Sequence, residues 1–419
     1  MNGTPFAQGR HLARLTAGML AVLGVGLVLG TGTARATEKT PIRIGVIAPM
    51  SAAEGKGIVR GAKLAAAEIN AHNGIDGRPI KLYTYDDQLS ASTAVRDFQR
   101  LVQQDKVVAV VGTWLSEVAL AVEPWASRLK TPYLISDAGS PQLTRRVHEH
   151  YGRYKYSFSM LSNSVTMAHT VCDFVHHTLA AKMGAQRAAI LSENAKWTQA
   201  FDQTFEKCLP KAGTKVVDHL RFDPGTSDFT PVFEKVEKHH PGVLVTGLAH
   251  TGLEATVQWH QRQVPSLMVG MNALAQSHGF WKQSNGAAQD VVTLSGPVRG
   301  VDLTPKTAPY MDAFIQRFGD KVAPGFGVTT YDAIHILRNA IERAGSTNAD
   351  KLVAALEKTD YVGAGNAGHI RFYGRSAPYT HNSTYRMIMI QWQGGKRVPV
   401  WPPSIAKPVK LPGFVQLGR

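Results

Sequence analysis

Short apolar runs alternate along the chain with stretches that have the periodicity of an amphipathic helix. Residues 107–111 form a continuous apolar run of the kind that a fully buried strand has, and residues 133–135 form a shorter one. Between them, apolar residues recur from Ser116 onward at the i, i+3, i+4 and i+7 spacing that predicts a helix. The right-handed crossover of such a strand–helix–strand unit places the carboxyl ends of both strands at one edge of a parallel sheet.

This edge is the expected place for a ligand. The predicted helix begins at Ser116, and the second strand runs into a loop of small residues, 136–140. The first N–H groups of a helix lack partners within the helix and attract an anion such as a carboxylate. Open α/β sheets bind ligands at the carboxyl ends of their strands. The plainer alternatives are that Ser116 only caps the helix and that Asp137 only accepts N–H groups of its own loop.

The alternation of strands and helices predicts an α/β protein with two doubly wound, parallel-sheet lobes of similar plan. Strands are expected at residues 41–48, 80–85, 107–111, 133–135, 188–192, 214–220, 243–246, 267–269, 291–294, 369–372 and 385–393. Helices are expected at residues 57–70, 165–182, 198–211, 253–263, 307–318, 329–344 and 348–358. Three further helices are expected: one that follows a cap at Ser92, one that begins at Ser116 and one that ends at residue 239. The Pro-rich tail from Val398 is expected to be irregular.

Residues 1–36 have the pattern of a cleavable export signal. A basic start with Arg10 and Arg14 precedes an apolar segment at residues 15–30, and Ala34-Arg35-Ala36 supplies a cleavage site after Ala36. The apolar segment is shorter than the roughly 20 residues that span a bilayer, so an uncleaved anchor is the weaker alternative. We expect a soluble, exported chain of about 380 residues, enough for two ordinary domains.

Composition bears on whether the chain binds nucleic acid and on whether its two cysteines form a disulfide. The net charge is +15, but the basic residues are scattered and no nucleic-acid-binding module is present, so a solvated basic surface is expected. Cys172 and Cys208 both lie in the exported part, where a disulfide is permitted. The sequence does not decide between a disulfide bridge and two buried thiols.

Enzyme signatures are absent from the sequence. It contains no G-x-S-x-G, H-E-x-x-H, Walker or G-x-G-x-x-G motif. The histidines on either side of Glu149, at 148 and 150, and the adjacent pairs at 176–177 and 239–240 are expected to be solvated surface residues instead of metal ligands. We therefore expect no catalytic residue, no metal and no cofactor.

Several motifs in order resemble one family. They are IRIGVIAPMS, GAKLAAAEINAHNGIDGRPIKLYTYDD, the G-x-x-x-S of GTWLS, the S-x-P-x-L-T of SPQLT, TTYDAIHIL and GHIRF. With them, nearly all of the exported chain resembles the branched-chain amino-acid-binding (Leu/Ile/Val-binding-like) family of ABC-transporter periplasmic proteins. The resemblance implies the type I periplasmic binding fold, a Venus flytrap.

In that family, three strands cross between the lobes and a ligand closes the cleft by bridging them. The resemblance places the crossings near residues 157–160, 294–297 and 361–372. Lobe I would then combine residues 37–157 with 298–362, and lobe II residues 158–297 with 363–419. Such closure is a hinge motion that must be driven by contacts with the ligand.

The resemblance also implies site residues in the first lobe and one in the second. Ser116 matches the serine that holds the ligand carboxylate, and Asp137, Ala138 and Gly139 match the loop that contacts its carboxylate and amine. Trp197 falls where the second lobe commonly presents a tyrosine over the ligand, although a tryptophan there can also belong to the core.

Three positions depart from the family pattern. The usual threonine of the first-lobe loop is Gly139, with Ser140 beside it, and the usual second-lobe tyrosine is Ala249, next to His250. The acid that usually pairs with the ligand's ammonium is Asn272.

The change at Asn272 bears on the ligand. A buried ammonium needs a carboxylate, and by this comparison only Asp137 supplies one. Either the first lobe holds the amine, or the ligand is a carboxylate, an amide or another small polar metabolite without one. Trp114 and Trp197 add stackable apolar surface.

The sequence therefore predicts a monomeric periplasmic substrate-binding protein that delivers a small amino acid or related carboxylate or amide to an inner-membrane ABC permease. The alternatives are a sensory subunit that presents its ligand to a receptor and, more remotely, a periplasmic hydrolase. No nucleic-acid partner is expected.

Overall fold

The structure is a computed structural model and describes residues 39–365 and 368–418. The expected export signal, with its cleavage site after Ala36, lies outside the described residues. Among the described residues, five strands form a first, fully parallel sheet. In sheet order they are β2 (Ile80–Asp86), β1 (Ile42–Ala48), β3 (Ala109–Gly112), β4 (Tyr133–Ile135) and β5 (Ser157–Ser159).

Both faces of this sheet are buried, as the continuous apolar runs predict. Successive side chains of a strand point to opposite faces. Ile44 and Val46 belong to one apolar core, and their neighbour Ile47 belongs to another. In the adjacent strand, Val111 belongs to the same core as Ile44, and Val110 belongs to the same core as Ile47. The sheet is therefore doubly wound, with a layer of helices on each face.

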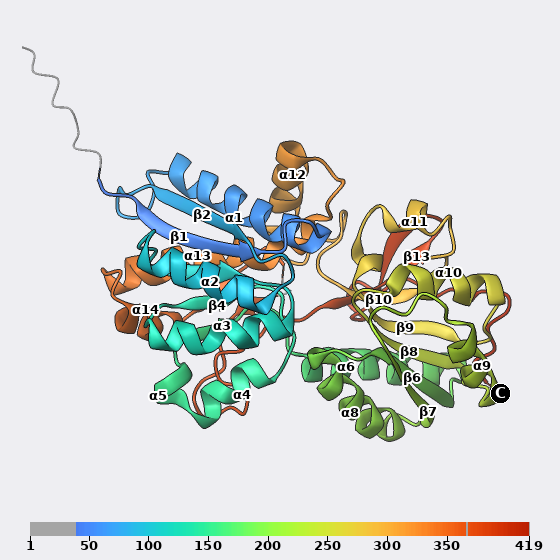
Figure 1. Ribbon diagram of the computed structural model, residues 1–419. Helices are drawn as coiled ribbons and strands as arrows, with labels where there is room; N and C mark the ends of the chain where they lie inside the picture. The colour runs from blue at the N-terminus through green and yellow to red at the C-terminus, as the bar shows by residue number, and fades with distance from the viewer. Residues whose placement is uncertain (1–38, 366–367, 419) are drawn as a thin grey trace, which may run out of the picture. The chain divides into compact units, whose positions relative to one another are not determined.

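Helices from distant parts of the sequence form these layers (Figure 1). One layer contains α1 (Ala53–Ala71), α12 (Thr307–Phe318), α13 (Val328–Ala344) and α14 (Ala349–Leu356). The other contains α2 (Ala91–Gln103), α3 (Ser116–Arg128) and part of α4 (Gln142–Glu149), which is followed by the short α5 (Tyr151–Tyr154).

A second sheet contains seven strands within the described ranges. In sheet order they are β14 (Lys396–Trp401), β13 (Ile388–Gln393), β10 (Val292–Ser295), β9 (Leu267–Asn272), β8 (Val243–Leu248), β6 (Arg187–Glu193) and β7 (Lys215–Phe222). The strands from β10 to β7 pair in parallel, whereas β13 and β14 pair antiparallel. The second lobe thus has the parallel core that was predicted and an antiparallel hairpin at one edge.

The hairpin corrects the prediction of an irregular tail. Gly394 and Gly395 have φ values of 56° and 75°, which suit the two-residue turn that joins twisted strands. Pro399 is tolerated because β14 is the edge strand and need not donate a hydrogen bond outward. The proline content of the tail concealed this strand.

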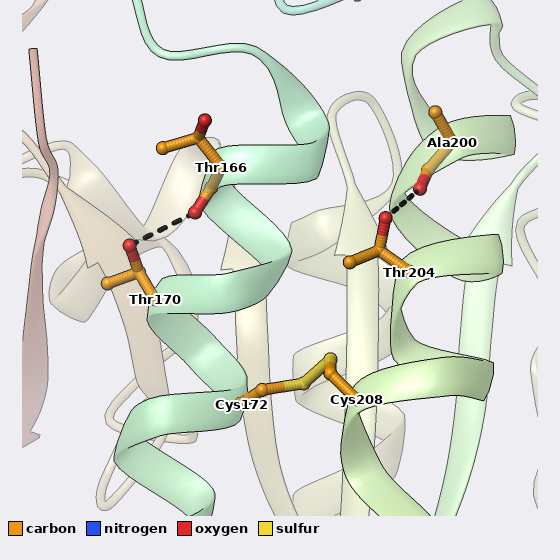
Figure 2. Close-up of a disulfide and its surroundings, with 6 residues drawn as sticks. All are labelled: Thr166, Thr170, Cys172, Ala200, Thr204 and Cys208. Atoms are coloured by element: carbon orange, nitrogen blue, oxygen red, sulfur yellow. Dashed lines mark hydrogen bonds between the residues drawn. A yellow bond between two sulfur atoms is a disulfide. The ribbon is translucent and has the colours of Figure 1, made fainter. Parts of the chain in front are cut away.

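The helices of the second lobe are α6 (Ser164–Phe174), a π-helical segment Val175–Ala180, α7 (Ala181–Met183), α8 (Lys196–Lys211), α9 (Thr230–Lys238), α10 (Gly252–Arg262) and α11 (Phe280–Gln283). Short 3₁₀ turns lie at Leu274–Gln276 and Pro324–Phe326. Figure 2 shows α6 beside α8, joined by the disulfide Cys172–Cys208, which settles in the structure the choice between a bridge and two thiols.

Two connections between the sheets run side by side. The N–H of Ser159, at the end of β5, donates to the carbonyl of His381 at 3.0 Å. The N–H of Ser383 donates back to the carbonyl of Ser159 at 2.8 Å. The chain therefore leaves the first sheet after β5 next to the segment by which it returns to the second sheet before β13.

The third connection lies later than residues 361–372. Ile370 and Phe372 pack into the core of the first sheet, whereas Tyr385 and Met387 pack into that of the second. The lobe boundaries at 157, 297 and 362 remain predictions, but these contacts lead us to expect the third boundary after Ser383 instead of at 362.

The starts of α1 and α2 are among those that differ from the predictions. The cap of α2 is Ser90, whose Oγ accepts from the N–H of Thr93 at 3.3 Å, in place of Ser92. α1 begins at Ala53 instead of residue 57. Glycines disfavour a helix, but a side chain on Gly57 would overlap Phe326, so close packing explains glycine there.

Within residues 39–365 and 368–418, no helix has the length and apolar character needed to cross a bilayer.

Candidate functional site

The start of α3 is held against the loop after β4. Leu115 is the N-cap residue, and the first helical N–H bonded to its carbonyl is that of Ala119, at 3.0 Å. The N–H groups of residues 116–118 come before this bond, and the first N–H groups of a helix have no acceptor within the helix. The hydroxyl of Ser116 accepts from the N–H of Ser140 at 3.1 Å. Ser116 is therefore not the helix cap, and its side chain joins the helix start to the loop.

The loop places Asp137 above the sheet edge. The N–H of Asp137 donates to the carbonyl of Thr113 at 3.2 Å, and its Oδ1 accepts from Thr329 Oγ1 of α13 at 2.7 Å. Burial raises the pKa of Asp137 to about 7, against the lowering effect of the Thr329 hydroxyl, and the nearby Glu54 carboxylate adds to the rise. Near neutral pH, a bound cation would favour the ionised form of this group.

Two adjoining pockets lie at this edge and share Trp114, Asp137, Leu161, Met271 and Ala273 in their walls. The other lining residues of the first pocket are Leu115, Ser116, Gly139, Met167, Trp197 and Ala249. Those of the second are Glu54, Gln276, Gly296, Gly325, Phe326, Thr329, Tyr385 and Met387. Each pocket combines residues from both sheets, as a ligand site between two lobes requires.

The second lobe contributes Trp197 and Ala249 to the first pocket. The Trp197 ring packs on Phe201, with ring centroids 5.1 Å apart, and its Cβ lies 3.9 Å from the place that a side chain on Gly139 would occupy. Trp197 is thus both attached to the second core and part of the pocket wall. Ala249 leaves the pocket open where the family pattern has a tyrosine.

His250 lies beside the pockets and is held by a buried carboxylate. Its Nδ1 lies 2.9 Å from Glu193 Oε2, and its N–H donates to Glu193 Oε1 at 2.7 Å. Thr251 donates to Oε1 with both its N–H and its hydroxyl. Burial by itself raises the pKa of Glu193, but these hydrogen bonds outweigh it and lower that pKa. The His250 ring lies 5.8 Å from the Trp114 ring, a contact between the two lobes.

Asn272 is not a wall of either pocket, which corrects its expected position opposite the ligand. It is 1% exposed. Its Nδ2 donates to the Gly252 carbonyl at 3.0 Å and to Thr256 Oγ1 at 3.1 Å, and its Oδ1 accepts from the Ala275 N–H at 3.1 Å. A side chain whose donors and acceptor are all in use fixes the end of β9 and does not need a ligand.

Sequence reasoning found part of the pocket. Ser116, Asp137, Gly139, Trp197, Trp114 and Ala249 line it, and their contact with a ligand remains a prediction. Three other expected residues do not line it: Ala138 packs in the core, the hydroxyl of Ser140 accepts from the N–H of Gln142 at the start of α4, and His250 is held by Glu193.

Sequence reasoning missed Glu54, Thr329 and Tyr385, which line the second pocket. The signal available for Glu54 was an acid just beyond the carboxyl end of the first strand, at the edge already assigned to the ligand. Its helix was expected to begin three residues later, so that Glu54 fell in a loop. No periodic pattern marked Thr329 and Tyr385, which come from the other end of the chain.

The chain matches known proteins over most of its length. The family model described as Periplasmic binding protein covers residues 41–396. An amino acid binding protein of Pseudomonas aeruginosa is 27% identical over 347 residues, which cover 80% of this chain and 86% of that relative. Leu/Ile/Val-binding protein homolog 7 of Brucella melitensis is 22% identical over 413 residues, 94% of this chain and 99% of the relative.

Solved structures share the fold. The branched-chain amino acid transporter substrate binding protein LivJ of Streptococcus pneumoniae, in complex with isoleucine, has a TM-score of 0.74 and 23% identity, covering 85% of this chain and 98% of that one. A solute binding protein of R. palustris in complex with benzoate has a TM-score of 0.73 and 17% identity, covering 90% of this chain and 99% of that one. The fold, the order of the motifs and the family match agree with the resemblance seen in the sequence. This chain belongs to the periplasmic binding protein family.

Proposed function

We propose that this protein is the periplasmic substrate-binding subunit of an ABC importer, and that it captures a small amino acid or a related carboxylate or amide between its lobes. The observation that carries the proposal is the composition of the first pocket. The helix start at Ser116 and the loop at Gly139 come from the first sheet, and Trp197 and Ala249 come from the second. A solute in this pocket touches both lobes at once.

The pocket suits a small solute with one acidic end. The first N–H groups of α3 favour a carboxylate, because they lack helical partners and lie at the positive end of the helix dipole. Trp114 and Trp197 offer flat apolar surface for the remainder of the solute. Contacts made to both lobes by one ligand stabilise the closed form over the open one, which is the condition for ligand-driven closure.

Known relatives support the class of ligand and the transport role. Similar proteins are named for amino acids or for Leu/Ile/Val, and similar structures hold isoleucine or benzoate. From this we infer a periplasmic location and an inner-membrane permease as partner. Catalysis is not part of the proposal: the hydroxyl of Ser116 accepts from an amide instead of donating to a histidine, the arrangement that would activate it as a nucleophile.

A thermal-shift screen of amino acids, benzoates and small amides tests this function. A ligand at 100 times its Kd stabilises the folded chain by about 2.7 kcal/mol, so the melting temperature rises. Gly139→Leu should remove the shift: its side chain points toward Met167 Cε and Trp197 Cβ, and it would fill the pocket.

The matched control is Gly152→Leu, the same substitution at a position with open space around it. This variant should keep the full shift. If no compound in the screen raises the melting temperature, or if Gly139→Leu responds as the unaltered chain does, the pocket is not the binding site.

A further inference from the structure

Glu54 is a buried carboxylate that faces the second pocket. It lies in the first turn of α1, and its side chain is 4% exposed. Oε1 has no hydrogen-bond partner among the described residues. A carboxylate oxygen taken out of water without a donor is costly. An unpartnered acceptor at the wall of a ligand pocket indicates that the ligand supplies the donor.

Asp137 stands at the same pocket and reinforces this charge. The lining residues of the two pockets, taken from the described ranges, include two carboxylates and no Lys, Arg or His side chain. Burial raises the pKa of Glu54, and the charge of Glu54 adds to the rise that burial causes in the pKa of Asp137. The pocket therefore carries an excess of negative charge when both groups are ionised.

One basic group of the other lobe, His250, acts on Glu54 but is already engaged by another carboxylate. His250 lowers the pKa of Glu54 by its charge, but its Nδ1 lies 2.9 Å from Glu193 Oε2. The other groups at this wall are hydroxyls and an amide: Thr329, which donates to Asp137, Tyr385 and Gln276. These neutral groups add no positive charge to the wall of the second pocket.

We propose that the ligand presents a cationic group with N–H donors, a primary ammonium or a guanidinium, to Glu54 and Asp137 in the second pocket. The proposal rests on the proposed function and deepens it, because it names the class of solute. An amino acid can meet both demands, with its carboxylate at the start of α3 and its cationic nitrogen near Asp137. Trp114, Phe326 and Tyr385 add aromatic surface that favours a cation.

This assignment chooses between the two possibilities that the sequence left open. Asn272 suggested a ligand without an amine, but Asn272 does not line the pocket, and the first lobe has its own acids at the site. A solute that is only an anion would have to bind beside two carboxylates, both of which would then need protons. A cation would instead favour the ionised forms of both.

The two cases differ in the direction of proton transfer, which can be measured. At pH 7, binding of a cation should release protons, because it favours the ionised form of Asp137, whose pKa burial raises to about 7, and of Glu54, whose pKa burial also raises. Binding of an anion such as benzoate should take protons up. Calorimetric titrations of the full chain in phosphate and in Tris, which differ in ionisation enthalpy, give the sign, and they need no variant.

The titrations use L-leucine, L-arginine, L-ornithine and benzoate with the unaltered chain, with Glu54→Gln and with Glu117→Gln. Glu117 is the matched control, since it occupies the first turn of α3 at the same sheet edge but lines neither pocket. We expect an amine-bearing probe to bind most tightly with proton release. Glu54→Gln should weaken it about 10- to 100-fold, the usual effect of losing a charged hydrogen bond, and reduce the release. Glu117→Gln should change Kd less than about 3-fold.

Failure of the cation assignment can be told apart from failure of the proposed binding function. If benzoate binds most tightly with proton uptake, or if Glu54→Gln binds leucine or a basic amino acid as the unaltered chain does, the cation assignment is wrong and the binding function stands. If none of the probes binds the unaltered chain, the proposed function fails and this assignment fails with it.

Discussion

Replacing Asn272 separates a structural residue from a ligand contact. Its amide joins the end of β9 to Gly252 and Thr256 of α10 and to Ala275 of the following turn through three hydrogen bonds of 3.0 to 3.1 Å. Asn272→Ala removes all three and leaves their partners buried. Asn272→Asp keeps the shape but replaces the two N–H donors by acceptors that face the Gly252 carbonyl.

The expected magnitude follows from these bonds. Each contributes about 1 kcal/mol, and leaving buried partners unsatisfied adds to the loss, so Asn272→Ala should lower the free energy of unfolding by about 3–5 kcal/mol. In Asn272→Asp, burial raises the pKa of the new carboxyl in the folded chain. The folded state then holds more protons than the unfolded state above pH 4, so this variant should lose stability as pH rises from 5 to 8.

Urea unfolding at pH 5 and pH 8 measures both effects, and ligand titration measures the affinity. The folded fraction of Asn272→Ala should bind its ligand within about 3-fold of the unaltered Kd, a change below 1 kcal/mol. Asn194→Ala, at an exposed position that accepts from Arg221 Nε, is the control and should cost about 1 kcal/mol or less. Unchanged stability together with a tenfold loss of affinity would refute a structural role and return Asn272 to the ligand site.

Three further predictions concern stability. Replacing Cys172 and Cys208 together by Ala should lower the free energy of unfolding by about 4 kcal/mol, because the bridge closes a loop with a sequence separation of 36, and an unchanged urea midpoint would contradict this. Ser116→Ala should cost the ligand-free chain about 1–3 kcal/mol, since the N–H of Ser140 loses its acceptor; a destabilisation seen only with ligand present would show that this bond matters little. Burial raises the pKa of Glu123 to about 8, so the folded chain keeps a proton that the unfolded chain releases near pH 4.5, and stability falls between pH 5 and 8; this fall should be smaller in Glu123→Gln, and an equal fall would argue against the shifted pKa.

The hydrophobic pattern by itself determined the α/β class and the sheet edge at which the two pockets lie. Apolar runs and helical periodicity depend on residues close in sequence, so β4 and α12 have the bounds that were expected. The start of α3 lies next to the loop after β4 because the geometry of a strand–helix–strand unit leaves little choice. Ser116 and Gly139 were found for this reason.

Only the tertiary structure decided which side chains face the pocket. Met271 and Asn272 are neighbours in β9, yet Met271 lines both pockets whereas Asn272 turns to α10. Glu54 meets Thr329 and Tyr385 because α1, α13 and the approach to β13 pack together from opposite ends of the chain. Periodicity fixes the face of a residue within its own element, but a pocket depends on how distant elements pack, and this is set by the fit of their surfaces.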